Sequence, residues 1–83
     1  MWRTLPLDYV ILEVLTKKPA GTTLTERELY DEVTKVVDYE IPYSDFLKAL
    51  MKLEMHGFIN VITVKEGFRH IVYFGVKNER GEE

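Results

Sequence analysis

The chain has 83 residues, of which 46 % are apolar and 30 % are charged, and its net charge is −3. This composition indicates one folded globular domain and excludes a chain that is disordered throughout. The absence of cysteine excludes disulfide bonds, a thiolate nucleophile and a Cys-type zinc site.

Two further features of the composition bear on where the protein works. No run approaches the roughly 18 apolar residues of a membrane-spanning helix, and the opening "MWRTLPLDYV" lacks a basic segment followed by an apolar core. We therefore expect a cytoplasmic protein with no membrane partner. The chain has no glutamine and only two asparagines, which favours a thermophilic source because these side chains are heat-labile.

A helix and a short strand are predicted first along the chain. Apolar residues recur every three or four positions from Leu7 to Leu15, and Pro6 suits the first turn because its missing N–H is not needed there. The "KPAG" stretch ends this helix. The run Thr-Thr-Leu at 22–24, with its two β-branched threonines, then predicts a strand long enough only for a minor role in a sheet.

Two more helices follow. Thr25 and Glu28 have the spacing of a capping box, which predicts the start of a second helix that ends near Asp38. Ser44 is a preferred N-cap and predicts a third helix that runs to about His56.

The apolar spacing then changes from every third or fourth residue to every second one. Gly57 can adopt the left-handed conformation that closes a helix. The runs "FINVITV" and "FRHIVYFGV", separated by "KEG", predict a β-hairpin. With Glu66 and Gly67 in the turn, Val64 faces Arg69. The core-facing residues of this register are Ile59, Val61, Val72 and Phe74.

The same register leaves an apolar outer face on the hairpin. Strand side chains alternate between faces, and a sheet covered on one side should place polar residues on the other. The cover is predicted to be the N-terminal segment with Trp2, a second copy of the chain across a two-fold axis, or another protein. The predicted interface consists of Trp2, Ile62, Val64, Ile71 and Tyr73.

The stretch "KALMKLEMHGFI" resembles the end of the third helix in the winged helix-turn-helix family, in its small archaeal-type form. The Ala-Leu pair, the Leu-Glu pair and the glycine followed by two apolar residues carry this resemblance, together with the capping box and the hairpin. It implies an α+β fold: a three-helix winged helix-turn-helix with a C-terminal β-hairpin wing. The winged-helix domain is predicted at 1–76, and a flexible acidic tail at 77–83.

The resemblance also implies a function, binding of double-stranded DNA by a small homodimeric transcriptional regulator. In this family the third helix usually enters the major groove and the hairpin tip contacts phosphates. The residues that match these positions are Tyr43, Ser44, Lys48 and Lys52 on the helix, and Lys65 and Arg69 on the wing.

An alternative use of the fold is protein contact in a transcription, replication or membrane-remodelling assembly. Residues 26–45 contain seven acids and two bases, although the acids of 26–32 are typical of a solvated helix face. Met51 and Met55 either close the edge of the core, which we favour for Met51, or form an adaptable protein-binding surface. A continuous positive surface favours DNA, and a broken one favours a protein partner.

Nothing in the sequence indicates catalysis. The two histidines, His56 and His70, lie on different elements without a metal-ligand spacing, and neither a nucleophile motif nor a glycine-rich phosphate loop is present. We expect no enzyme activity, no metal or cofactor, and no small-molecule substrate.

Overall fold

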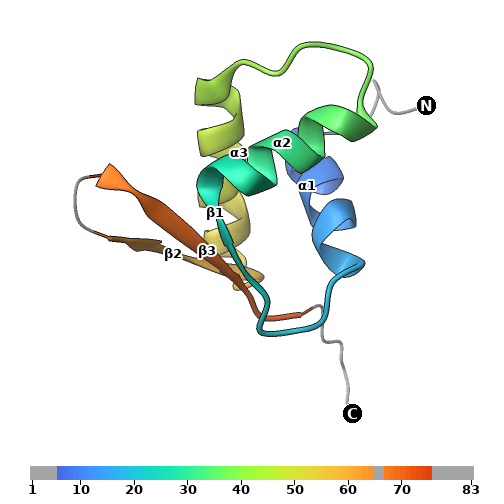
Figure 1. The fold of residues 1–83 in the computed structure, drawn as a ribbon. Helices are drawn as coiled ribbons and strands as arrows, with labels where there is room; N and C mark the ends of the chain where they lie inside the picture. The colour runs from blue at the N-terminus through green and yellow to red at the C-terminus, as the bar shows by residue number, and fades with distance from the viewer. Residues whose placement is uncertain (1–5, 65–66, 76–83) are drawn as a thin grey trace.

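The computed structural model describes residues 6–64 and 67–75, which form a small α+β fold (Figure 1). The helices are α1 (Leu7–Thr16), α2 (Glu26–Val36) and α3 (Tyr43–Met55). The strands β1 (Thr23–Thr25), β2 (Ile59–Thr63) and β3 (Arg69–Tyr73) form one antiparallel sheet. The predicted order of elements is confirmed. The tail predicted at 77–83 lies outside the described residues.

Local hydrogen bonds determine where α2 and α3 begin. The predicted capping box is present: the Glu28 N–H donates to Thr25 Oγ1, and the Thr25 N–H donates to Glu28 Oε1, both at 3.0 Å. The N-cap of α3 is Pro42, two residues before the predicted Ser44, so the helix begins at Tyr43. The Pro42 carbonyl accepts from the Asp45 N–H at 3.0 Å, so Ser44 lies inside the first turn.

Helix α3 ends in a Schellman motif, in which Gly57 is the left-handed residue that the sequence predicts. The Phe58 N–H donates to the Leu53 carbonyl at 3.1 Å, and the Gly57 N–H donates to the Glu54 carbonyl at 3.0 Å. Gly57 has a φ of +87°, a conformation that costs little only for glycine. This turn directs the chain into β2, which begins at Ile59.

The core lies between the three helices and the inner face of the sheet. Phe46 of α3 is fully buried, and its ring meets that of Tyr30 edge to face with centroids 5.1 Å apart. The Tyr30 hydroxyl donates to the Ile41 carbonyl at 2.6 Å, which holds the connection between α2 and α3 against the core. The other fully buried large side chains are Val10, Ile11, Leu15, Leu29, Val33, Ile59 and Ile71. Each contributes about 1.5–3 kcal/mol by its removal from water.

Strand β3 lies in the centre of the sheet, and the hairpin register differs from the predicted one by one residue. Ile62 lies opposite His70, whereas we expected it opposite Ile71. The turn is the cause, because the Val64 N–H donates to the Phe68 carbonyl at 2.6 Å, so that Val64 faces Phe68. A shift of one residue moves every side chain of β3 to the opposite face.

The prediction that Ile71 and Tyr73 face outward is therefore wrong. Both are core residues, 1 % and 3 % exposed, and Leu24 of β1 lies opposite Ile71 on the inner face. Val72 and Phe74, which we expected in the core, lie on the outer face instead, where Phe74 is 49 % exposed.

The predicted interface also contains Trp2, Ile62 and Val64. Ile62 and Val64 are exposed on the outer face of the hairpin, as predicted. Trp2 lies outside the described residues. A contact with a second copy or another protein across this face stays a prediction. On the outer face of β3, Val72 and Phe74 take the places expected for Ile71 and Tyr73.

A side chain of α3 fixes the position of the hairpin. The N–H of Val61, in the edge strand β2, donates to Glu54 Oε2 at 2.9 Å. An edge strand presents free N–H groups to which another chain could add, and this carboxylate occupies one of them. Glu54 therefore holds β2 beside α3 and protects part of the sheet edge.

Candidate functional site

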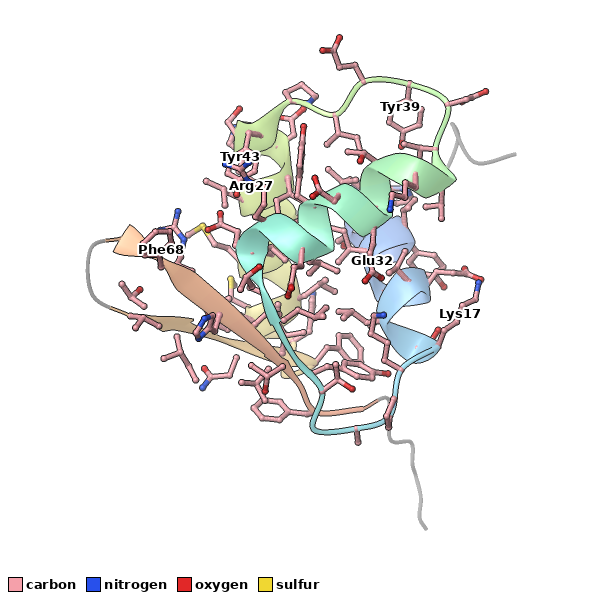
Figure 2. All side chains as sticks on the ribbon, in the orientation of Figure 1. Lys17, Arg27, Glu32, Tyr39, Tyr43 and Phe68 are labelled. Atoms are coloured by element: carbon pink, nitrogen blue, oxygen red, sulfur yellow. The ribbon has the colours of Figure 1, made fainter. Side chains whose placement is uncertain are left out.

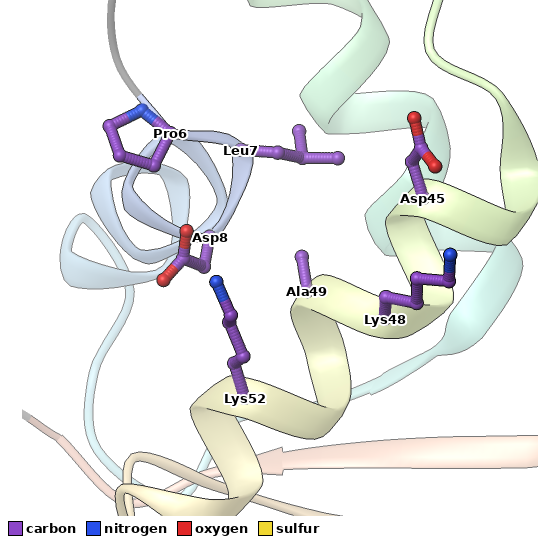
Figure 3. A pocket seen from close by; sticks show the side chains of 7 residues that line it. All are labelled: Pro6, Leu7, Asp8, Asp45, Lys48, Ala49 and Lys52. Carbon is purple, nitrogen blue, oxygen red and sulfur yellow. The ribbon is translucent and has the colours of Figure 1, made fainter.

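The exposed residues of α3 lie on two flanks that differ in chemistry. The flank that faces α1 carries Lys48 and Lys52, which border a hollow of about 320 Å³ together with Asp8 and Asp45 (Figure 3). In Figure 3 the Lys52 side chain extends toward Asp8, and Lys48 lies on the Asp45 side of the hollow. We call these four residues the α1-side surface. Its two cations are accompanied by two acids.

The opposite flank of α3 faces the hairpin and is mainly apolar. Here a second hollow of about 320 Å³ is lined by Leu47, Leu50, Met51 and Glu54 of α3 and by Val61, Thr63 and Arg69 of the hairpin. Met51 is 62 % exposed, so the expectation that it closes the core is wrong. Met55, one turn further along α3, is 85 % exposed.

Arg69 points toward α2 and does not join the lysines. Its Nε donates to Glu26 Oε1 at 3.1 Å, and the Glu26 side chain is only 10 % accessible. The expectation that Glu26 belongs to a solvated helix face is wrong, because β3 packs its arginine over the start of α2. The predicted cluster of basic residues is likewise divided, and Lys65 lies outside the described residues.

A third hollow, of about 370 Å³, lies where α2, α3 and the hairpin tip meet. Its lining residues are Thr25, Glu26 and Arg27 from the start of α2, Tyr43 from α3, and Gly67, Phe68, Arg69 and His70 from the hairpin. Figure 2 shows Tyr43, Arg27 and Phe68 on the same side of the molecule. We call this hollow the α2 pocket. Arg69 lines both the α2 pocket and the hollow beside Met51.

Tyr43 forms one wall of the α2 pocket. Its ring packs edge to face on Tyr30, with centroids 4.8 Å apart, and 38 % of the residue stays exposed. Burial raises the pKa of the Tyr43 hydroxyl above its ordinary value, and the neighbouring Glu26 carboxylate raises it further, against the opposing charges of Arg27 and Arg69. The hydroxyl therefore stays protonated at neutral pH.

The structure brings only some of the predicted site residues together. Tyr43 and Arg69 share the α2 pocket, Lys48 and Lys52 lie on the α1-side surface, and Ser44 is exposed in the first turn of α3. Sequence reasoning missed the other six residues that line this pocket: Thr25, Glu26, Arg27, Gly67, Phe68 and His70. No local pattern marks them, because the hairpin that covers the start of α2 lies some forty residues later in the chain.

Neither a metal centre nor a membrane span is found in the described residues. Within 6–64 and 67–75, no three His, Cys, Asp or Glu residues are grouped so that they could hold a metal ion. None of the helices in these ranges is both long and apolar enough to cross a bilayer. A scan against protein-family models, a search of curated proteins and a search of solved structures found no match.

Proposed function

We propose that this chain is a winged-helix protein that binds another protein through the side of α3 that faces the hairpin. Three helices followed by a hairpin on a three-stranded antiparallel sheet are the arrangement implied by the resemblance. The binding surface consists of Tyr43, Leu47, Met51, Phe68 and Arg69, and we call it the hairpin-side surface. Fold alone does not decide what such a protein binds, so the chemistry of this surface carries the proposal.

The observation that carries the proposal is which residues α3 and the hairpin expose together. Met51 and Phe68 are 62 % and 66 % exposed, although both are large and apolar. Protein interfaces are enriched in aromatic residues, methionine and arginine, and depleted of lysine. Methionine also adapts its shape to a partner at little cost. Aromatic residues, methionine and arginine are all present here, and the lysines of α3 line the other hollow.

Binding of double-stranded DNA is the second candidate. Lys48 and Lys52 are exposed one helical turn apart on α3, which is the position that the family uses for the major groove. Two features weigh against it: Asp8 and Asp45 border the same hollow, and Arg69 is paired with an acid. Carboxylates next to phosphates reduce affinity, and DNA-binding domains are usually basic, whereas the pI of this chain is about 5.4.

The proposal is tested by photo-crosslinking in the cells that produce the protein. The crosslinking residue benzoylphenylalanine replaces Met51 in one variant and Tyr9 in a matched control, because both positions are about 60 % exposed but Tyr9 lies on α1. A protein captured only from position 51 is purified and titrated by calorimetry. We expect Met51→Glu to weaken binding at least about tenfold, because the partner would bury the new charge, and Tyr9→Glu to leave it unchanged.

DNA binding is measured in parallel with mixed-sequence duplex at two salt concentrations. Binding that weakens steeply with salt and is lost in a Lys48→Glu/Lys52→Glu variant would support the second candidate and contradict the first. Equal affinity of the captured protein for Met51→Glu and Tyr9→Glu would also contradict the proposed surface.

A further inference from the structure

The α2 pocket has the size and the mixed lining of a specific binding site. Its volume of about 370 Å³ lies within the usual range for such pockets, although it suits a side chain better than a large ligand. Phe68 and Tyr43 supply exposed apolar walls, and Arg27 and Arg69 supply two guanidinium groups. Because the pocket adjoins the hairpin-side surface through Arg69, the inference that follows depends on the proposed function.

A buried oxygen in this pocket has no hydrogen-bond partner. Glu26 Oε1 accepts from Arg69 Nε, but Oε2 is closed to water and accepts from no group within residues 6–64 and 67–75. Buried polar atoms are almost always satisfied, so an exception needs an explanation. The Tyr43 hydroxyl lies next to the Glu26 carboxylate, which raises the Tyr43 pKa, but the hydroxyl is not placed to donate a hydrogen bond to Oε2. The pocket therefore lacks one donor, which a ligand N–H can provide.

The charges around the pocket favour an anion as the other part of the ligand. Arg27 is exposed and forms no ion pair with a described residue, and Arg69 uses only its Nε in the bond to Glu26. Guanidinium groups bind carboxylates with paired, charge-assisted hydrogen bonds. A lysine in the same place would meet both guanidinium groups, and only the charge of Arg69 is balanced by Glu26. The ligand that satisfies both requirements carries a carboxylate and an N–H donor.

We propose that the α2 pocket receives an acidic side chain from the partner protein. The aspartate or glutamate carboxylate lies between Arg27 and Arg69, and a backbone N–H of the same segment donates to Glu26 Oε2. Since Oε2 is closed to water in the free protein, one of the exposed wall side chains turns outward when the segment enters. A DNA phosphodiester supplies an anion but no donor, so it would leave Oε2 unpaired.

The test uses nuclear magnetic resonance, which detects weak binding residue by residue. The probes are the blocked peptides acetyl-Gly-Glu-Gly-amide and acetyl-Gly-Gln-Gly-amide, with inorganic phosphate and duplex DNA as comparisons. We expect the glutamate peptide to shift the resonances of Glu26, Arg27, Tyr43 and Arg69 Nε, and the glutamine peptide to have little effect. Arg27→Gln should weaken binding at least about tenfold. Lys35→Gln, at an exposed cation near the end of α2, should leave it unchanged.

Several outcomes would overturn this inference. Equal shifts by the glutamine peptide, unchanged binding by Arg27→Gln, or the same shifts caused by phosphate or duplex DNA would each refute an acidic peptide segment as the ligand. Binding measurements with the partner captured at position 51 distinguish failure of the pocket inference from failure of the proposed function. If that partner binds Arg27→Gln as tightly as it binds the native chain, the pocket inference fails and protein binding stands. If the peptide binds but Met51→Glu has no effect on the partner, the proposed surface fails instead.

Discussion

The ion pair between Arg69 and Glu26 should contribute far more to stability than its geometry alone suggests. Arg69→Met keeps much of the aliphatic stem but removes the donor. The Glu26 carboxylate then loses the one hydrogen bond that it forms within the described residues, while its side chain is 10 % accessible. A hydrogen bond to a charged group contributes about 1.5–3 kcal/mol. Because the arginine side chain is 37 % accessible and its charge is partly screened, we expect a loss of about 2 kcal/mol in the free energy of unfolding.

The chain provides a matched control in its second ion pair. Lys18 Nζ lies 3.0 Å from Glu32 Oε1, nearly the same separation as in the first pair, but the Glu32 side chain is 38 % accessible. Exposed pairs of this kind contribute about 0.2–1 kcal/mol, so Lys18→Met should cost much less. For a domain of this size, the melting temperature should fall by about 8–16 °C in Arg69→Met and by about 1–8 °C in Lys18→Met.

Thermal and urea unfolding, followed by circular dichroism, measure both losses. In a Glu26→Leu/Arg69→Met variant, at least about half of the lost stability should return, because no uncompensated charge is left in the interior. Equal losses in the two single variants would refute the reasoning, since burial of the carboxylate is the only large difference between the pairs. A double variant that is less stable than Arg69→Met would refute it as well.

Three further predictions concern the helix end, the pocket wall and the sheet register. Gly57→Ala should cost about 1–2 kcal/mol in urea unfolding, because the added Cβ meets no atom within 4 Å and only the positive φ of +87° opposes it; an unchanged midpoint would contradict this. In an ultraviolet absorbance titration, Tyr43 should ionise above its ordinary pKa of 10.0, and higher still in Arg27→Gln, because Arg27 lowers that pKa. The folded state thus prefers the neutral phenol, so this contribution to stability is complete below pH 10.0 and declines as the pH rises past it. A lower Tyr43 pKa in Arg27→Gln would be inconsistent with the geometry. Ile71→Ala should lower the free energy of unfolding by about 2–4 kcal/mol, and Val72→Ala by about 1 kcal/mol or less. The reverse order would support the register expected from the sequence instead.

These predictions bear on function because the hairpin and the start of α2 form one surface. Glu26 holds Arg69 in place, and Arg69 lines both the α2 pocket and the apolar hollow beside Met51. A variant that breaks this ion pair should therefore change the shape of the proposed protein-binding surface as well as the stability. Lys48 and Lys52 should be unaffected, because they lie on the opposite flank of α3.

The helices and their ends were predictable because their causes are local. The apolar spacing from Leu7 to Leu15, the capping box at Thr25 and the Schellman glycine at Gly57 all act within one or two helical turns. The N-cap of the third helix was displaced by two residues, because Pro42 takes the position that Ser44 was expected to hold. This error is small, since the buried stripe of the helix stays the same.

The hairpin shows where the local pattern became ambiguous. Its second strand is apolar on both faces, so Ile71 and Val72 are equally acceptable core residues by sequence. The length of the turn decides between them, through the bond from the Val64 N–H to the Phe68 carbonyl. A change of one residue in that turn reverses which side chains of β3 face the core.

The sequence by itself determined the order of the elements, the three helices, the capping box of α2, the glycine that ends α3 and the existence of a hairpin, because each depends on residues a few positions apart. The tertiary structure alone decided which face of β3 is buried, that Glu26 is an interior carboxylate paired with Arg69, and that the lysines of α3 lie on the flank away from the hairpin. The ion pair joins residues 43 positions apart, and the register of β3 depends on a turn between strands whose apolar pattern suits either face. The energies of both arise only when packing removes the groups from water.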